Sequence, residues 1–256
     1  MNKSNLLFYN AYQEFYKMAE CSLCFKKYCE EAFGKDFSQD GFSDVEQIDL
    51  IFKYASLDEN SHILDIGCGN GKMLQYLQKK TGATIYGFDY SENAIASAKS
   101  DINVRSNFQV GVMGEVEYPD ESMDLITSMD TMYFAKDMNT LINQIHRWLK
   151  PNGLFFCGYQ EGDVMPKTKN SSTTVLAKAM RDNDIKYEVI DYTKETYQML
   201  KHKRQVITKM KADFKAEKLC RWYSIILRQT DCVKVSFDEY AKKNARYLYL
   251  FRKPVI

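Results

Sequence analysis

The sequence predicts an α/β protein built on a doubly wound, mostly parallel sheet of seven strands. A helical cap precedes the sheet, and a helical insertion precedes its last strand. Between residues 61 and 193, short apolar runs alternate with stretches whose apolar side chains recur at helical spacing. Such alternation implies parallel strands with helices on both faces. Glycines directly follow the first apolar run and Asp89 ends the second, as in sheets that bind a nucleotide at the carboxyl ends of their strands.

The turn after the first predicted strand has the pattern D-I-G-C-G-N-G-K, which begins at Asp65. Gly67, Gly69 and Gly71 have no Cβ, so the backbone can turn sharply and a ligand can approach it closely. Asp89 lies at the tip of the second strand, where an acid accepts hydrogen bonds from the two hydroxyls of a ribose. Dinucleotide dehydrogenases use G-x-G-x-x-G instead, and Asp65 would repel their pyrophosphate. The carboxylate suits a ligand that carries an ammonium and a sulfonium.

This pattern resembles the first motif of class I S-adenosylmethionine-dependent methyltransferases. Residues 108–113 resemble the family's third strand and adenine loop, and residues 123–130 resemble its fourth strand and the loop after it. Residues 149–156 resemble its turn into the fifth strand, so the motifs follow the family's order. The resemblance extends to about Tyr192. It implies a Rossmann-like fold, S-adenosyl-L-methionine as cofactor and S-adenosyl-L-homocysteine as its product.

The resemblance also implies which residues bind the cofactor. Tyr90 is placed to lie against the adenine. Val112 stands where the family often has an Asp, so we expect adenine recognition to rest on backbone groups around Met113 and Gly114. Because ligands of such sheets bind where the strand order reverses, Asp65, Asp89, Met113, Ser128 and Tyr159 should surround one crevice. The predicted cofactor-binding residues are Asp65, Gly67, Gly69, Gly71, Asp89, Tyr90, Met113, Gly114 and Ser128.

Residues 1–60 are predicted to form the helical cap. An amphipathic stripe of Phe8, Tyr12, Phe15 and Ala19 predicts a helix over residues 5–33. After a polar link, residues 43–46 have the form of a capping box with Ser43 at the cap, and a helix follows to about residue 55. In methyltransferases of the resembling type such a segment folds over the cofactor, which makes Gln39 and Gly41 candidates for a lid.

The chain beyond the predicted core is also helical. Residues 61–193 are the expected cofactor-binding core, with a helix at 172–181, a strand at 187–193 and Ser91 as the cap of an earlier helix. Apolar residues from Tyr197 to Phe214 recur at steps of three or four and predict a long helix, followed by a second at 219–227. We assign residues 194–245 to an inserted substrate lid and residues 246–256 to the last strand.

Composition limits the classes of partner. The 35 basic and 34 acidic residues nearly cancel, so no global field would steer the protein to nucleic acid or an anionic membrane. The basic run 201–204 is interpreted as the solvated face of a helix. No apolar run approaches the roughly 18 residues of a membrane span. Seven cysteines without an apparent secretion signal indicate free thiols in the cytoplasm.

No metal site is expected, because Cys21, Cys24 and Cys29 lack a nearby fourth ligand. The chain is rich in aromatic residues, with 18 Tyr and 15 Phe, many of them outside the predicted core. Two interpretations stay open: these rings pack the helical additions, or some of them line a closed pocket around a cationic or apolar small molecule.

The predicted activity is transfer of a methyl group to a small-molecule acceptor, an amine nitrogen, by in-line displacement in a lidded pocket. The helical additions look like those of methyltransferases that act on glycine, sarcosine or dimethylglycine. Tyr133, Tyr159 and Asp130 are the catalytic candidates by position, and Glu161 and His202 are further candidate bases. Two alternatives are a methyltransferase acting on tRNA or protein, and a protein that binds S-adenosylmethionine without turnover.

Overall fold

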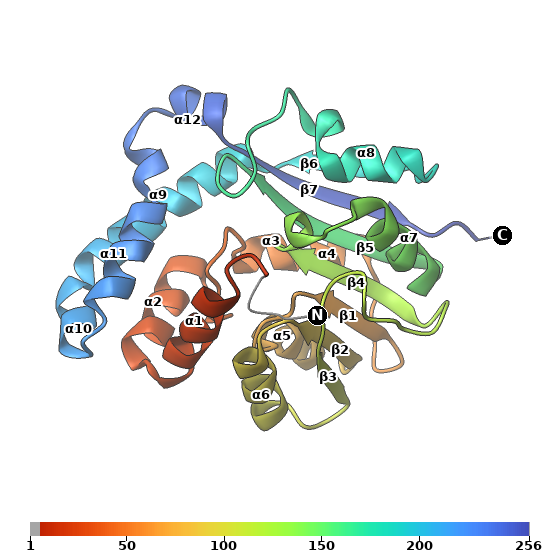
Figure 1. The fold of residues 1–256 in the computed structure, drawn as a ribbon, viewed down its shortest axis with the longest axis horizontal. Helices are drawn as coiled ribbons and strands as arrows, with labels where there is room; N and C mark the ends of the chain where they lie inside the picture. The colour runs from red at the N-terminus through yellow and green to blue at the C-terminus, as the bar shows by residue number, and fades with distance from the viewer. Residues whose placement is uncertain (1–5, 256) are drawn as a thin grey trace.

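The structure is a computed structural model and describes residues 6–255. Its centre is a seven-stranded sheet with the order β3-β2-β1-β4-β5-β7-β6, as Figure 1 shows. β7 runs antiparallel to β5 and β6, and the other neighbouring strands are parallel. The predicted fold class is confirmed. The strands are β1 His62–Ile66, β2 Thr84–Asp89, β3 Ser106–Val110, β4 Met123–Met129, β5 Leu149–Glu161, β6 Glu188–Asp191 and β7 Ala245–Arg252.

Helices cover both faces of the sheet. One face carries α7 (Met138–Trp148) and α8 (Val175–Asp182), and the other carries α3 (Val45–Asp49), α4 (Ile51–Tyr54), α5 (Lys72–Thr81) and α6 (Glu92–Asp101). Successive side chains of a strand point to opposite faces. Phe155 and Phe156 of β5 accordingly enter the two different cores. Both residues are completely buried, so β5 holds the two apolar layers together.

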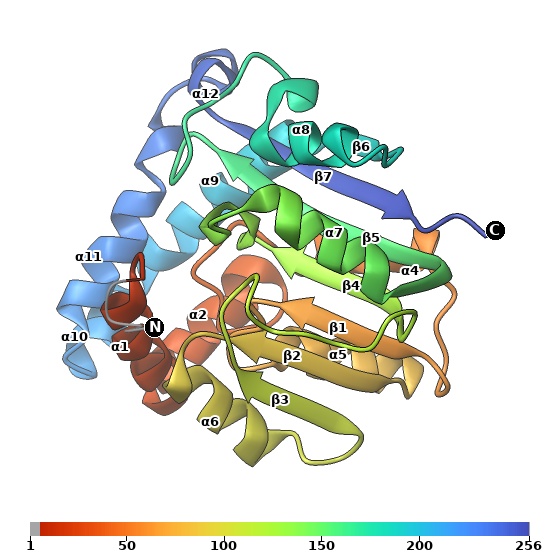
Figure 2. The same cartoon turned by 45° about the vertical axis from the view of Figure 1, so that its right-hand side comes forward.

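A third layer of helices lies at the carboxyl ends of the parallel strands, and we call it the helical layer. Figure 2 shows α1 and α2 beside α9, α10 and α11 there, facing the arrowheads of β1, β2 and β4. Side chains from the two chain regions share one apolar core, which includes Phe15, Phe25, Leu200 and Phe214. The layer consists of α1 Tyr9–Cys21, α2 Leu23–Phe33, α9 Thr193–Lys209, α10 Lys211–Ala216, α11 Cys220–Gln229 and α12 Phe237–Lys243.

The predicted helix over residues 5–33 is wrong as a single element, and its first residue lies outside the described part of the chain. The helix ends at Cys21, and Ser22 begins a second one: its Oγ accepts a hydrogen bond from the Phe25 amide at 2.9 Å. Ser22 also donates to Glu217 at 2.6 Å, and Glu217 accepts from the Cys24 amide at 2.8 Å. A residue from the far part of the chain therefore completes the cap of α2.

Other element boundaries also differ from the predictions. Asp44, not Ser43, caps α3, because its carboxylate accepts from the Gln47 amide at 2.9 Å. The long helix predicted up to Phe214 divides at Met210 into α9 and α10. α12 was not predicted, whereas the end of β3 at Val110, with residues 111–113 in the loop after it, agrees with the predicted strand and loop. The Ser91 cap is confirmed, since its Oγ accepts from the Ala94 amide at 3.2 Å.

Candidate active site

The loop between β1 and α5 has the conformation that its glycines permit. Gly67, Gly69 and Gly71 have φ angles of 75°, 54° and 76°, in the left-handed region that favours glycine. The amides of Gly67 and Cys68 donate to the Phe88 carbonyl at 2.9 and 3.1 Å, which fixes the loop to β2. A Cβ on Gly71 would meet Phe108 at 2.9 Å, so Gly71 packs against the core while the other two glycines line a cavity.

Asp89 is held at the tip of β2 by backbone amides. Its Oδ2 accepts from the Gly69 amide at 3.0 Å and its Oδ1 from the Ser91 amide at 2.8 Å. Burial raises the pKa of Asp89 to about 6, although these hydrogen bonds favour the ionised form. The side chain therefore joins the glycine loop to α6 and remains at the cavity wall, where a ribose-binding acid is expected.

Asp65 is the second buried acid at the loop. Its Oδ1 accepts from the Thr127 hydroxyl at 2.7 Å. Burial raises the pKa of Asp65 to about 8, and the charge of Asp89 adds to the shift. Within the described chain no Lys, Arg or His pairs with this carboxyl group. A buried carboxylate without a cation is costly, so the position is suited to a ligand that brings a positive charge.

These residues surround one cavity at the carboxyl ends of β1, β2 and β4. Most of the predicted cofactor-binding residues line it, but Gly71, Gly114 and Ser128 do not. The Ser128 hydroxyl instead donates to the Ile66 carbonyl at 3.2 Å and so joins β4 to β1. The described residues that line the cavity are Leu6, Leu7, Tyr12, Tyr16, Phe37, Ser38, Gln39, Asp40, Gly41, Phe42, Ser43, Ile48, Asp65, Gly67, Cys68, Gly69, Met73, Phe88, Asp89, Tyr90, Val112, Met113, Met129, Asp130, Thr131, Tyr133, Phe134, Asp163 and Val164.

Helix α1 covers the glycine loop. A Cβ on Gly69 would lie 2.2 Å from the Tyr16 hydroxyl oxygen, so Tyr16 rests directly on the loop. Gln13 fastens α1 to α6, because its Oε1 accepts from the Ser91 hydroxyl at 2.9 Å and from the Asn93 amide at 3.0 Å. Tyr12 was predicted only as a packing residue, and Tyr16 was not singled out. Their spacing of four residues places both rings over the cavity.

The link between α2 and α3 forms another wall. Residues 37–43 all line the cavity, including the lid candidates Gln39 and Gly41. Gln39 Nε2 donates to the Ser43 carbonyl at 3.2 Å, and Lys72 at the start of α5 pairs with Asp36. The link is therefore joined both to itself and to the helix that follows the glycine loop.

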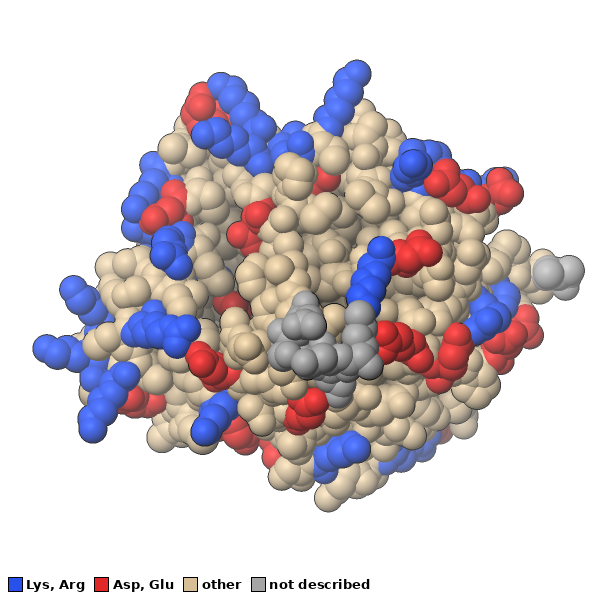
Figure 3. All heavy atoms as spheres, viewed as in Figure 1, with Lys and Arg blue, Asp and Glu red and all other residues tan. Residues whose placement is uncertain are grey.

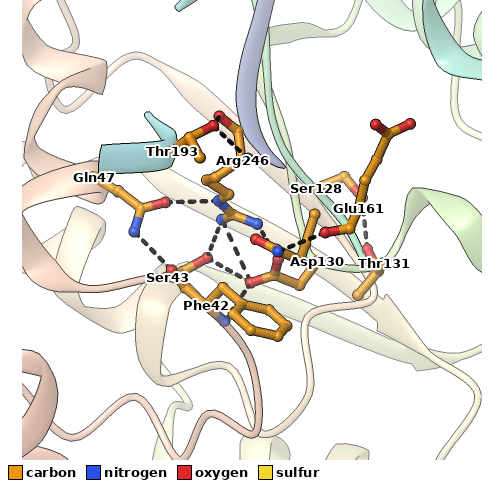
Figure 4. A network of polar contacts seen from close by, with 10 residues as sticks. Phe42, Ser43, Gln47, Ser128, Asp130, Thr131, Glu161, Thr193 and Arg246 are labelled. Atoms are coloured by element: carbon orange, nitrogen blue, oxygen red, sulfur yellow. Dashed lines mark hydrogen bonds and ion pairs between the residues drawn. The ribbon is translucent and has the colours of Figure 1, made fainter. Parts of the chain in front are cut away.

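A buried polar network holds this link against the sheet (Figure 4). Asp130, at the end of β4, accepts from the Phe42 amide at 3.0 Å and from the Ser43 hydroxyl at 2.8 Å. Its carboxylate also pairs with Arg246 of β7, whose Nε donates to Gln47 Oε1 at 3.0 Å. Arg246 was predicted only as a strand residue. An arginine within the otherwise apolar and aromatic run 245–251 was the available sign of a buried partner.

The three catalytic candidates occupy different depths. Tyr133 and Asp130 line the cavity, whereas Tyr159 is buried behind Tyr133, with ring centroids 5.8 Å apart in an edge-to-face arrangement. Burial raises the pKa of both phenols above the ordinary range of tyrosine. At neutral pH the two hydroxyl groups are therefore protonated donors.

The two further candidate bases lie outside the cavity wall. Glu161 is buried and accepts from the Thr168 amide at 2.9 Å. His202, on the outer side of α9, contacts the Glu31 carbonyl at 2.8 Å. Neither side chain lines the cavity, and the contacts of both stabilise the fold around it.

Lys203 is buried, although the basic run 201–204 was interpreted as a solvated face. Its side chain is 2% exposed, and burial lowers its pKa. Lys203 Nζ donates to Gln229 Oε1 at 3.1 Å, and Gln229 Nε2 donates to Asp40 Oδ1 at 2.5 Å. This chain of contacts runs from α9 through α11 to the cavity wall, where burial raises the pKa of Asp40.

Residues 6–255 contain no cluster of three His, Cys, Asp or Glu side chains that could hold a metal ion. No helix in this range combines the length and apolar character needed to cross a bilayer. The seven cysteines are free thiols.

The antiparallel β7 within a parallel sheet, the glycine turn after β1 and the acid after β2 together define a class I methyltransferase fold. Residues 64–157 match the family model described as a methyltransferase domain, so this part of the chain is similar to such a domain. The predicted family resemblance is confirmed.

Among curated proteins, a phosphoethanolamine N-methyltransferase of Plasmodium falciparum is 31% identical over 131 residues, which cover 50% of this chain and 48% of that protein. The mitochondrial arginine-hydroxylase NDUFAF5 of Rattus norvegicus is 30% identical over 134 residues, which cover 51% of this chain and 37% of that protein. The matches thus span about half or less of these relatives' own lengths.

Two solved structures share the fold. Phosphoethanolamine N-methyltransferase 2 of Haemonchus contortus, in complex with phosphomonomethylethanolamine and S-adenosylhomocysteine, has a TM-score of 0.75 at 20% identity, covering 95% of this chain and 60% of that one. A putative sarcosine dimethylglycine methyltransferase of Galdieria sulphuraria has a TM-score of 0.63 at 14% identity, covering 82% and 84%. At these identities the likeness concerns the fold.

Proposed function

We propose that this protein is a methyltransferase that uses S-adenosyl-L-methionine to methylate a small-molecule acceptor at an amine nitrogen. One observation carries the proposal. In the segment that matches the methyltransferase domain, a glycine turn and two buried acids, Asp65 and Asp89, lie in one cavity beneath aromatic side chains of α1. The proposed cellular location is the cytoplasm, which the seven free thiols favour.

The residues of the cavity fit the cofactor. Asp89 can accept hydrogen bonds from the ribose hydroxyls, and Gly67 and Gly69 allow close approach of the backbone. Asp65 lacks a basic partner in the described chain, and the cofactor's ammonium would supply one. Tyr90 and Met113 at the cavity wall would contact the adenine. When bound, the cofactor would supply an electrophilic methyl group: the lone pair of the acceptor nitrogen would form the N–C bond as the C–S bond breaks and leaves its electron pair on sulfur.

The chain's own residues supply orientation and exclusion of water. Tyr16 covers the glycine loop, and Asp130 holds the link 37–43 in place through its contacts to Phe42 and Ser43. The Tyr133 hydroxyl, protonated at neutral pH, can donate to a polar group of the acceptor, and Tyr159 packs behind its ring. Enclosure of this kind supplies several kcal/mol through positioning. Residues 194–245 were predicted to be the acceptor lid; none of them lines the cavity, and in this proposal they hold its wall from behind, through the contact of Gln229 with Asp40.

Two observations support an amine as the acceptor: the activities for which similar proteins are named, and the shape and lining of the cavity. Phosphoethanolamine N-methyltransferases are among the relatives, and the cavity has aromatic walls that suit a small, enclosed ligand. Basic side chains gather over α10 and α11 at the edge of Figure 3, whereas both signs are spread over the rest of that face. The 35 basic and 34 acidic residues of the chain nearly cancel, so the protein lacks the large net positive charge that nucleic acid favours.

The proposal is tested in two steps. Calorimetry should show saturable binding of S-adenosylmethionine and S-adenosylhomocysteine. Incubation with cofactor labelled at the methyl group should then transfer label to a pool of small amines. Label in tRNA or protein instead would support the second predicted activity. Saturable binding without transfer to any pool would support the third, a binding protein without turnover.

A further inference from the structure

The cavity wall is acidic and aromatic, with no basic side chain among its described residues. Besides Asp65 and Asp89, which the cofactor accounts for, Asp40, Asp130 and Asp163 line it. The two nearby cations lie behind these acids. Arg246 is completely buried and paired with Asp130, and Lys203 reaches Asp40 only through Gln229.

The three acids differ in how far their charge is satisfied. Asp130 accepts hydrogen bonds on both oxygens and pairs with Arg246. Asp40 accepts one hydrogen bond, from Gln229 to Oδ1, so its Oδ2 has no donor within the described residues. Asp163 accepts none within residues 6–255, and it is exposed, so solvent reaches its carboxylate. Burial raises the pKa of Asp40 and the charge of Asp163 adds to the rise, while burial raises the pKa of Asp163 and the charge of Asp130 adds to it.

Aromatic rings form much of the remaining wall, together with aliphatic and small polar side chains. Tyr12 and Phe134 lie edge to face with centroids 6.4 Å apart, and Tyr133 and Phe134 are 5.0 Å apart. Ring faces attract cations, and ring edges exclude water from a small ligand. An acceptor with a positive charge and an apolar remainder therefore meets complementary groups. A carboxylate or phosphate on the acceptor would face Asp40 and Asp163 with no cation at the wall to receive it.

We propose that the acceptor is an amine without a carboxylate or phosphate group, whose ammonium form is bound by Asp40 and Asp163 beside Tyr12 and Tyr133. The bound ammonium gives one proton to the Asp40 carboxylate, and the nitrogen lone pair that this frees is the nucleophile for the methyl group. This inference rests on the proposed function and names the substrate class of the same site. It separates this protein from relatives and structural neighbours named for phosphoethanolamine, sarcosine or dimethylglycine. Gln229 and Lys203 are positioning residues, since they hold Asp40 and do not line the cavity.

The test compares matched amines that differ in one anionic group. The pairs are ethanolamine with phosphoethanolamine, N-methylethanolamine with sarcosine, and 2-phenylethylamine with phenylalanine. Binding of each is measured calorimetrically to the full-length protein saturated with S-adenosylhomocysteine, and methyl transfer is measured separately. In at least one pair the anion-free amine should bind at least about tenfold more tightly than its anionic partner. In no pair should the anionic member bind more tightly than the anion-free amine. Tighter binding of the anionic members, or no binding of any anion-free amine, would overturn the inference.

Variants connect the preference to the two acids. Asp40→Asn and Asp163→Asn should each raise the KM for the anion-free amine about tenfold while the Kd for S-adenosylhomocysteine stays unchanged. Asp182→Asn, at an exposed position at the end of α8, is the matched control and should change neither value. Unchanged amine binding in both cavity variants would also overturn the inference. Amine binding without methyl transfer would contradict the proposed function alone, because the binding measurement does not depend on turnover.

Discussion

Arg246 of β7 and Asp130 at the end of β4 form a buried ion pair, although 116 positions separate them in sequence. The Arg246 side chain is fully buried and that of Asp130 is 10% exposed. Asp130 has a φ of 63°, a left-handed conformation that aspartate tolerates better than most residues. The pair connects the sheet to the link that closes the cavity, so the wall of the site depends on the last strand of the fold.

Arg246→Met should therefore destabilise the protein. The substitution leaves the Asp130 carboxylate buried without its cation, and breaking a buried pair in this way costs about 3–5 kcal/mol. Urea unfolding should show a lower midpoint. Glu239→Gln, which breaks the exposed Lys242–Glu239 pair, is the control and should cost less than about 1 kcal/mol. If the two variants lost similar amounts of unfolding free energy, burial would not be the reason for the cost at Arg246.

Asp89→Asn should weaken cofactor binding while preserving the fold. The amide keeps the shape of the carboxylate but loses its charge, and a hydrogen bond to a charged group is worth about 1.5–3 kcal/mol. The Kd for S-adenosylmethionine should rise roughly tenfold to a hundredfold. Circular dichroism should show unchanged secondary structure. An unchanged Kd would contradict the assignment of Asp89 to the ribose hydroxyls.

Asp65 should make stability depend on pH. Its folded pKa of about 8 exceeds its ordinary value of 3.8, so between these values the folded protein holds a proton that the unfolded chain has released. The contribution of this group to the free energy of unfolding therefore rises as pH falls from about 8 towards 4, by at most about 1.4 kcal/mol per pH unit. Asp65→Asn should lose this contribution. Parallel urea-unfolding profiles against pH for the two proteins would contradict it.

Cofactor binding should release a proton at pH 7. The cofactor's ammonium beside Asp65 would favour the ionised carboxylate and lower its pKa, so the proton held by the free protein leaves on binding. Calorimetry in buffers of different ionisation enthalpy measures this release. In Asp65→Asn the apparent binding enthalpy should vary much less between buffers. No buffer dependence in the unmodified protein would argue against an ammonium at this position.

Gly69→Ala should disturb the contact between the loop and α1. The new Cβ would overlap the Tyr16 hydroxyl, and the left-handed backbone itself costs roughly 1–2 kcal/mol for a residue with a side chain. Gly114→Ala is the control for the backbone cost alone, because its φ is 85° and nothing lies within 4 Å of its Cβ position. A double-mutant cycle with Tyr16→Ala should show coupling of about 0.5–3 kcal/mol in unfolding free energy. Additive effects would contradict the contact.

Lys203→Met should affect the acceptor more than the cofactor. The variant keeps the apolar stem but removes the donor to Gln229, so Asp40 loses its fixed orientation. Steady-state kinetics should show a several-fold higher KM for the amine with little change in kcat. The Kd for S-adenosylhomocysteine should stay the same. A parallel loss of cofactor affinity would indicate a general structural role for Lys203.

Local patterns were sufficient for the sheet and for the placement of the glycine turn and the two acids beside it. The glycine turn, Asp65 and Asp89 are set by the strand that precedes each of them, so their positions follow from short-range sequence. Ser91 was a correct cap for the same reason. The predicted domain boundaries and the roles of the site residues stay predictions, although the helical additions do lie at the carboxyl ends of the strands.

These local patterns could not predict contacts between residues that are far apart in the sequence. Ser43 and Asp44 are both good capping residues. The Ser43 hydroxyl instead contacts Asp130 and Arg246, which lie 87 and 203 positions away in the sequence, so Asp44 is the residue that caps α3. Lys203 could be recognised as buried only from the packing of α9 against α2 and α11. The division of the first helix at Ser22 likewise depends on Glu217, a distant residue.

The Glu217 cap of α2 means that the amino-terminal helices and the late insertion are stabilised as one unit. Deletion of residues 194–245 would uncover the apolar sides of α1 and α2, including the rings of Phe25 and Tyr28, and deletion of the first sixty residues would uncover Leu200 and Phe214 in turn. Neither deletion is expected to yield a stably folded shorter protein. A screen for shorter versions of this protein should therefore shorten the surface loops and keep both ends of the chain.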